Sequence, residues 1–149
     1  MRVLAARLAT GDPQTLRGWH AFGWLFGLLR QLHNDAASAA SEYDEDLVNG
    51  TRIVRLAHAL EVCPPADRGI LLELRELART DTVARVELRR RLDEPAVADG
   101  YRTRVEAMRQ HACTLVDRLA PPSSYRELVH RLVNTSSAHA CPRAAGTER

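Results

Sequence analysis

The sequence contains no lysine, so all 21 of its basic residues are arginine. Lysine-based Schiff-base chemistry is therefore excluded, because no side chain supplies a primary amine. Aromatic residues make up only 5% of the chain and the formal net charge is +2. A nucleic-acid surface is expected to combine a strong basic field with aromatic rings that stack on bases. The run Arg89-Arg90-Arg91 has no such rings near it, so we predict a solvated helix face there and no nucleic-acid partner.

Cysteines and long apolar runs are also scarce. Cys63, Cys113 and Cys141 are odd in number and far apart, which fits neither a zinc pattern nor a disulfide framework and favours reduced thiols. The longest apolar run, 21–29, has nine residues, whereas a membrane-spanning helix needs about 20. Arg2 interrupts the apolar start of the chain, which is not the pattern of a signal peptide. We expect a cytoplasmic protein without a membrane span.

Alanine, leucine, valine and arginine dominate the sequence, and this composition favours an all-α fold. The 149 residues are enough for one domain. Asp12-Pro13 and Asp81 are the residue types that begin helices. Apolar spacing and Gly/Pro breaks predict about six to seven helices, over 3–9, 13–41, 51–62, 66–78, 82–92, 96–119 and 124–133. We expect the helical domain to occupy residues 1–133 and a disordered tail to follow over 134–149.

Three glycines interrupt the helix predicted over 13–41, at Gly18, Gly23 and Gly27. Each costs about 1 kcal/mol in a helix interior relative to alanine. The close approach of a neighbouring helix would offset that cost, and so would a ligand tail lying against the glycines. Both alternatives stay open from the sequence.

Three oxygen-bearing side chains follow one another at four-residue intervals near the end of the same helix, namely Asn34, Ser38 and Glu42. A helix turns about 100° per residue, so all three lie on one face, about one turn apart. Hard oxygen donors, including the adjacent Asp35, are the ligands that suit Mg²⁺ shared with a phosphate-bearing substrate. The apolar residues upstream, such as Trp24, would suit a hydrocarbon tail. The sequence thus predicts a Mg²⁺ site at the end of an apolar helix.

The residues around this row also follow a recognisable order. They read Gln31-x-x-Asn34-Asp35-x-x-Ser38, then Asp46-x-x-x-Gly50, and Ala59-Leu60 about ten residues later. The order resembles the second aspartate-rich region of trans-isoprenyl diphosphate synthases (polyprenyl synthetases), over about thirty residues. That family has Gln-x-x-Asp-Asp-x-x-Asp and then Asp-x-x-x-Gly-Lys-x-Thr-x-Pro. Asn34 and Ser38 depart from it by replacing two aspartates, and Thr51 departs from it by replacing the lysine.

The resemblance implies part of an isoprenoid-synthase helical bundle, a prenyltransferase that acts on allylic prenyl diphosphates with Mg²⁺. It implies metal ligands at Asn34, Asp35, Ser38 and Glu42, a diphosphate contact at Arg52, and a substrate pocket with Gln31, Phe22 and Trp24. A surface ion pair is the alternative for Arg52, and core packing is the alternative for Trp24. The row of Asn34, Ser38 and Glu42 also resembles the Asn/Ser/Glu metal triad of class I terpene cyclases, which share the fold.

Enzymes of this kind also need another aspartate-rich motif, the first of the two, which lies well upstream. Only thirty-three residues precede Asn34, and Asp12 is the one acidic residue among them. We therefore expect this chain to correspond to a C-terminal half that is not competent alone, in a homodimer or heterodimer formed through helices. A terpene cyclase fragment remains an alternative. A non-catalytic helical subunit of an active synthase is another, as is an unrelated helical module.

Overall fold

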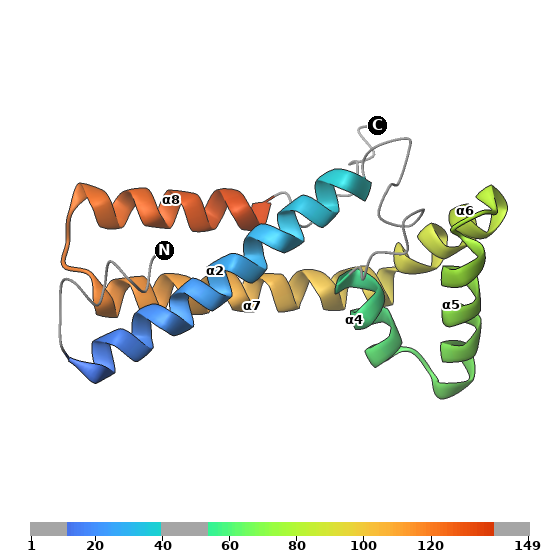
Figure 1. The fold of residues 1–149 in the computed structure, drawn as a ribbon, viewed down its shortest axis with the longest axis horizontal. Helices are drawn as coiled ribbons and strands as arrows, with labels where there is room; N and C mark the ends of the chain where they lie inside the picture. Colours follow the sequence, from blue (N-terminus) through green and yellow to red (C-terminus); the bar gives the residue numbers. More distant parts are fainter. Residues whose placement is uncertain (1–11, 40–53, 139–149) are drawn as a thin grey trace. The chain divides into compact units, whose positions relative to one another are not determined.

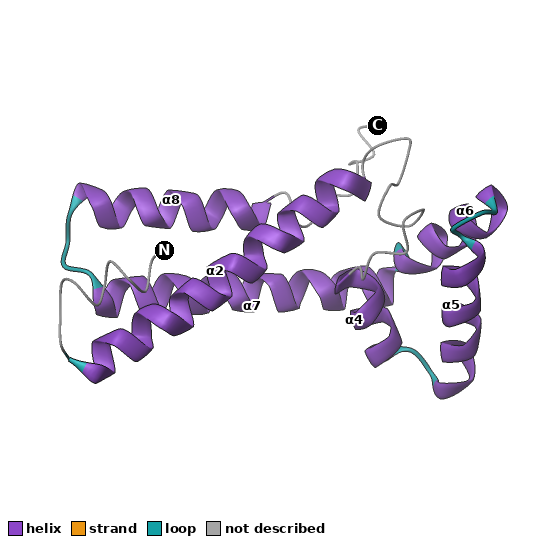
Figure 2. Ribbon diagram, in the orientation of Figure 1, coloured by secondary structure: helices purple, strands orange, loops and turns teal. Residues whose placement is uncertain are grey.

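A computed structural model describes residues 12–39 and 54–138, except the side chains of 35–39 and 138. Within these ranges the chain forms six α-helices and no strand (Figures 1 and 2). The all-α prediction is therefore confirmed. No helix in the described part is long and apolar enough to cross a membrane. The helices are α2 (Pro13–Ala39), α4 (Val54–Val62), α5 (Pro65–Leu77), α6 (Thr82–Leu92), α7 (Pro95–Leu119) and α8 (Ser124–Ala138).

The helix boundaries follow the sequence pattern closely, except at the end of α8. The helices expected over 66–78, 82–92 and 96–119 match α5, α6 and α7 within one residue at each end. In contrast, α8 continues past Val133 to Ala138, into the segment expected to begin a disordered tail. Ser136 and Ser137 are buried there, and their hydroxyls donate to the carbonyls of Leu132 (2.8 Å) and Asn134 (2.9 Å). The helix expected over 3–9 and the segment 139–149 lie outside the described residues.

Side-chain caps fix where several helices begin. The Asp12 carboxylate accepts the backbone N–H groups of Gln14 (3.2 Å) and Thr15 (2.8 Å) at the start of α2. A hydrogen bond with the Thr15 side chain, together with these backbone bonds, holds the pKa of Asp12 below its usual value. Asp81 accepts the N–H of Val83 at 2.7 Å and begins α6. These contacts satisfy N–H groups that have no partner inside the helix, as predicted for both aspartates.

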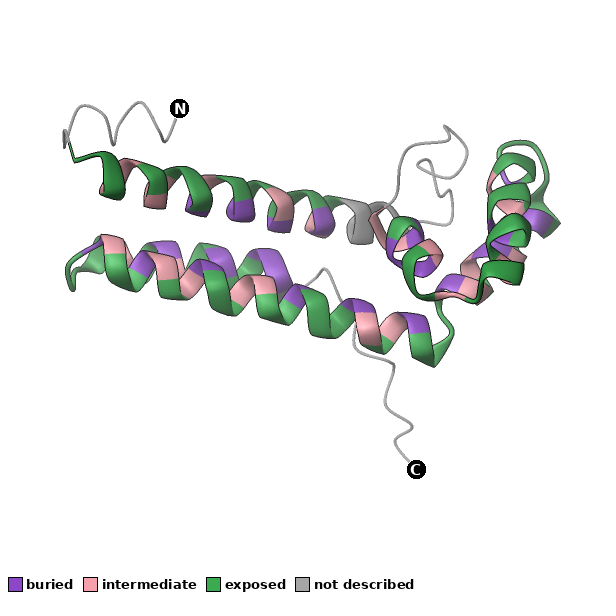
Figure 3. Cartoon of the chain, turned by 90° about the horizontal axis from the view of Figure 1, so that it is seen from below, coloured by how far each residue is buried: buried purple, intermediate pink, exposed green. Residues whose placement is uncertain are grey.

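The chain divides into two compact units that share α7, where the sequence suggested one domain. Unit 1 comprises residues 1–34 and 105–149, and unit 2 comprises residues 35–104. In unit 2, α4, α5, α6 and the beginning of α7 enclose an aliphatic core. Figure 3 shows buried residues on one side of each helix. The core of unit 2 consists of Leu56, Ala59, Leu71, Ala78, Leu88, Leu92 and Val97.

Unit 1 is built around the buried face of α2. The Phe22 ring stacks on that of Phe26, and it meets Trp19 edge-on, with 5.8 Å between ring centroids in each pair. The second part of α7 and the length of α8 supply mainly small and β-branched buried residues. The core of unit 1 comprises Phe22, Leu25, Phe26, Leu29, Leu32, Val105, Ala112, Val116, Ala120, Val129 and Val133.

The three glycines of α2 have different surroundings, and this predicts different effects of alanine. A Cβ atom added to Gly18 would lie 2.6 Å from the Leu119 side chain, whereas one added to Gly23 or Gly27 would meet no described atom within 4 Å. We expect Gly23→Ala and Gly27→Ala each to raise the free energy of unfolding of unit 1 by up to about 1 kcal/mol. Gly18→Ala should gain clearly less, because Leu119 must move. Urea unfolding followed by tryptophan fluorescence measures all three, and equal effects would contradict this packing.

Candidate functional site on the outward face of α2

The residues predicted to form the site are divided between two sides of α2. The outward face of α2 comprises His20, Trp24, Gly27, Gln31 and Asn34, which lie within about 80° of one another at 100° per residue. His20, Trp24, Gln31 and Asn34 are exposed, and the indole of Trp24 is 66% exposed. The opposite side of the helix is buried in unit 1. The amide and indole groups of the predicted site therefore share one accessible surface.

Phe22 belongs to the other side of the helix. It is only 1% exposed and packs in the core against Phe26 and Trp19. Residues two positions apart on a helix point in directions that differ by about 200°, so Phe22 and Trp24 cannot line the same wall. The predicted place of Phe22 in a pocket is therefore wrong, because Phe22 supports the helix from behind, whereas Trp24 and Gln31 are exposed on the outward face.

The predicted metal ligands are described only in part. Asn34 is exposed, and α2 continues to Ala39, so the backbone of Ser38 follows Asn34 after one helical turn. The side chains of Asp35 and Ser38, and the whole of Glu42 and Arg52, lie outside the described residues. No group of three or more His, Cys, Asp or Glu side chains within the described ranges could hold a metal ion. The Mg²⁺ site stays a prediction that rests on oxygen donors of the right kind at helical spacing.

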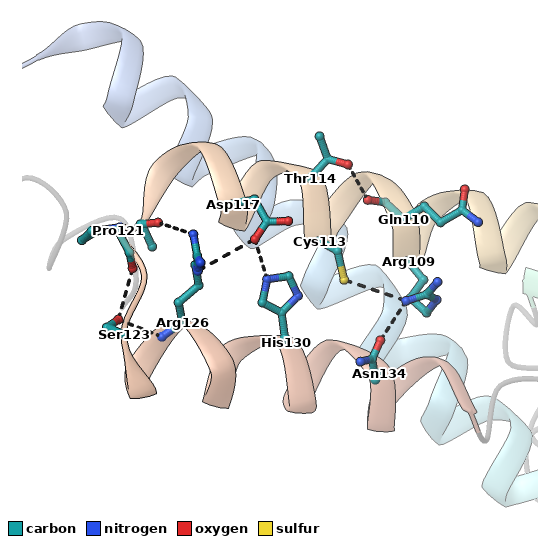
Figure 4. Close-up of polar contacts among 11 residues, drawn as sticks. Arg109, Gln110, Cys113, Thr114, Asp117, Pro121, Ser123, Arg126, His130 and Asn134 are labelled. Carbon is teal, nitrogen blue, oxygen red and sulfur yellow. Dashed lines mark hydrogen bonds and ion pairs between the residues drawn. The ribbon is translucent and has the colours of Figure 1, made fainter.

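A polar seam between α7 and α8 was not foreseen from the sequence (Figure 4). Asp117 accepts from His130 at 2.9 Å and also lies 3.9 Å from the Arg126 guanidinium. Further along, Arg109 donates to the Asn134 side chain at 2.9 Å. Four-residue spacing places Arg126, His130 and Asn134 on one side of α8. That spacing is visible in the sequence, but the partners on α7 are not, because they depend on which helices pair.

The seam contains a thiol, yet its surroundings argue against nucleophilic chemistry. Cys113 is half-buried and lies 4.0 Å from the Arg109 guanidinium. Burial is the main influence on this thiol, and it raises the pKa of Cys113 above its ordinary value. Reactive cysteines need a lowered pKa, because the thiolate is the nucleophile. The seam joins α8 to α7 through the contacts of Arg109 and Asp117.

The α4 helix carries three contacts that position it in unit 2. Arg55 forms an ion pair with Asp93 at 2.7 Å, and Glu61 forms a close pair with Arg104. Between these pairs, His58 is buried against the Tyr101 ring, with 5.9 Å between ring centroids. A Cβ on Gly100 would lie 3.0 Å from His58 Nε2, so the glycine lets the imidazole approach α7. These contacts hold the helix that follows the predicted metal and diphosphate segment.

The exposed Glu106–Arg109 pair on α7 predicts an acid-sensitive contribution to unit 1. Hydrogen bonds from Arg109 lower the pKa of Glu106 to about 2. A carboxyl whose pKa is lowered by folding stabilises the fold above its unfolded pKa, and the contribution disappears as pH falls toward the folded value. Unit 1 should therefore lose a small part of its stability between about pH 4.5 and about pH 2. The contribution is small because surface pairs are screened by solvent.

Glu106→Gln should flatten this acid dependence in urea melts followed by tryptophan fluorescence. Glu87 on α6 is the matched control, because Arg90 lowers its pKa to about 2 as well. Glu87 lies in unit 2, whereas both tryptophans lie in unit 1. Glu87→Gln should leave the tryptophan-detected acid dependence unchanged, and the reverse pattern would contradict the assignment.

No protein-family model, curated protein or solved structure matches this chain. A functional interpretation therefore depends on the residues themselves and on their placement in the two units.

Proposed function

We infer that the outward face of α2 forms one wall of a Mg²⁺-dependent site for an allylic prenyl diphosphate, as in polyprenyl synthetases. One observation carries this proposal. The exposed side of a long helix presents an indole at Trp24, open space at Gly27, and then amides at Gln31 and Asn34. An exposed apolar section followed by oxygen donors suits a ligand that has a hydrocarbon tail and a charged head.

The donor set fits the ion that the family uses. Asn34, Asp35, Ser38 and Glu42 offer only oxygen atoms, which Mg²⁺ prefers, and Arg52 could donate to a diphosphate as a bidentate guanidinium. Bound Mg²⁺ would neutralise the charge of the departing diphosphate. Loss of the diphosphate would leave an allylic cation near the metal, while the indole of Trp24, about 15 Å along the helix from Asn34, would face the hydrocarbon tail. In a synthase, that cation is captured by isopentenyl diphosphate, and in a cyclase by the substrate's own double bonds.

A non-catalytic helical subunit that partners an active synthase is the second candidate function. Several large apolar side chains on different helices support it, because they remain exposed in this chain, among them Val83 and Tyr125. Contiguous exposed apolar surface commonly marks an interaction site, and Tyr125 begins a row on α8 that continues with the exposed Leu128 and Leu132. The two functions differ in one testable respect, since only the first requires this chain to bind prenyl diphosphate.

The test is a direct binding measurement on the full chain. Farnesyl thiodiphosphate, which ionises poorly, is titrated into the protein by calorimetry with Mg²⁺ present and again with EDTA. We expect binding that requires Mg²⁺. The double variant Asn34→Ala/Ser38→Ala should bind at least tenfold more weakly, which corresponds to about 1.4 kcal/mol.

Gln14→Ala is the matched control, because it removes an exposed amide from the first turn of the same helix. Its affinity should equal that of the parent chain. Binding that is unaffected by EDTA, or equal in the parent and the double variant, would overturn the ligand assignment. A chain that does not bind the analogue at all would support the non-catalytic subunit instead.

A further inference from the structure

The α8 helix has a second apolar face that no described part of unit 1 covers. Val129, Val133 and Ser136 are buried inside unit 1, whereas Tyr125, Leu128 and Leu132 are 65%, 43% and 42% exposed. Figure 4 shows the polar seam on the α7 side of the same helix. We name Tyr125, Leu128 and Leu132 the outer stripe of α8.

The spacing of the outer stripe is that of a helix–helix contact. Its members are separated by three and then four residues, so they follow one line along the helix surface. A helix needs only one apolar stripe to attach to its own domain. Because the buried face already attaches α8 to unit 1, the outer stripe is available to a helix from another molecule.

Two charged residues on one flank of the outer stripe indicate which molecule supplies that helix. Glu127 and Arg131 are both exposed, lie on the same flank of the stripe, and form no ion pair with another described residue. In a two-fold symmetric pair, each copy presents the same surface to the other. An antiparallel second α8 would then bring Glu127 of each copy opposite Arg131 of the other. In a parallel two-fold pair, the same flank of the two copies would lie on opposite sides of the contact, so these charges would not meet.

We propose that the outer stripe of α8 is the contact surface of a homodimer in which two copies pair antiparallel across a two-fold axis. In the register that matches the charges, Leu128 of one copy inserts between Leu128 and Leu132 of the second copy. Two Glu127–Arg131 pairs border this apolar centre. This proposal does not depend on the prenyl diphosphate site, because the stripe lies on a different helix.

The size of the contact predicts a weak dimer. α8 has 15 residues, which at about 1.5 Å per residue gives a length of about 22 Å. One helix pair of this length buries less than the roughly 1,000 Å² expected of a stable specific interface. The monomer and dimer should therefore exchange with concentration, as expected of an interface below the standard size.

Reversing the charges at Glu127 and Arg131 tests the proposal. Sedimentation equilibrium on the full chain, over a hundredfold range of concentration, measures the result. Glu127→Arg and Arg131→Glu should each weaken dimerisation at least tenfold, because each brings like charges together. An equimolar mixture of these two variants should dimerise about as well as the parent chain, since every pair across the axis is again opposite in charge.

Two further variants separate a specific contact from general stickiness or misfolding. Leu128→Asp should remove the dimer, while Val83→Glu on α6, which also replaces an exposed apolar residue, should leave it unchanged. Circular dichroism must show parental helicity in each variant for its result to count. A parent chain that stays monomeric throughout, a dimer that Val83→Glu removes, or a mixture that does not recover would each overturn the proposal.

Discussion

Phe22→Ala is expected to lower the free energy of unfolding of unit 1 by about 3–5 kcal/mol, the range for aromatic truncation in a core. Phe22 is almost fully buried, and its ring contacts both Phe26 and Trp19. Truncation to a methyl group therefore removes the transfer free energy of the ring and leaves a cavity lined by two other rings. A loss of this size is a large fraction of the 5–15 kcal/mol that is typical of a whole domain.

Trp24→Ala is the matched control, since it removes an even larger ring from the exposed side of the same helix. Its effect should stay within about 0.5 kcal/mol, as is usual for surface substitutions. Tryptophan fluorescence measures both variants within unit 1, because the chain has two tryptophans and both lie on α2. Similar losses for Phe22→Ala and Trp24→Ala would contradict the division of α2 into a buried and an outward face.

Leu88→Ala should have a comparable effect on unit 2, with an expected loss of about 2–5 kcal/mol. Leu88 has no exposed surface and belongs to the core that joins α4, α5 and α6 to the start of α7. The neighbouring buried positions are leucines, alanines and a valine. Side chains in a packed core relax only partly around a cavity, so the cost exceeds simple transfer of the lost atoms.

Leu72→Ala on α5 is the control for this substitution, because Leu72 is of the same type and is exposed. It should cost less than about 1 kcal/mol. Hydrogen exchange at the backbone amides of α5 and α6 measures unit 2 without relying on the tryptophans of unit 1. Amides of α6 that keep their parental protection in Leu88→Ala would show that this core does not hold the helices of unit 2 together.

The sequence was sufficient to predict the helices, because each carries its own local signals. Asp81 caps α6, and Ala84, Leu88 and Leu92 follow at intervals of one turn, so both the start and the buried face were readable. The end of α8 was not predicted because Ser136 and Ser137 are typical of loops by composition. Their hydroxyls bond to carbonyls of the preceding turn, which lets a polar sequence continue as a helix inside unit 1.

In the candidate site, the sequence predicts side-chain positions only where these depend on a single helix. The spacing of Gln31 and Asn34 placed both on one face of α2, and both are exposed there. In contrast, the pairing of Asp117 with His130 joins two helices, so no local pattern could indicate it. Phe22 and Trp24 were both assigned to the substrate pocket that the resemblance implies. Helical geometry separates them, since residues two apart lie on nearly opposite sides.

The central claim is that the end of the outward face of α2 binds a divalent metal together with a diphosphate. Paramagnetic NMR tests it most directly, with Mn²⁺ in place of Mg²⁺ and inorganic pyrophosphate in place of the substrate head group. We predict that substoichiometric Mn²⁺ with pyrophosphate broadens the amide resonances of residues 34–38 first, and that excess Mg²⁺ restores them. Broadening that begins instead at the exposed carboxylates of α6 or α7, such as Glu87 and Glu106, would contradict the claim, as would spectra that Mn²⁺ leaves unchanged.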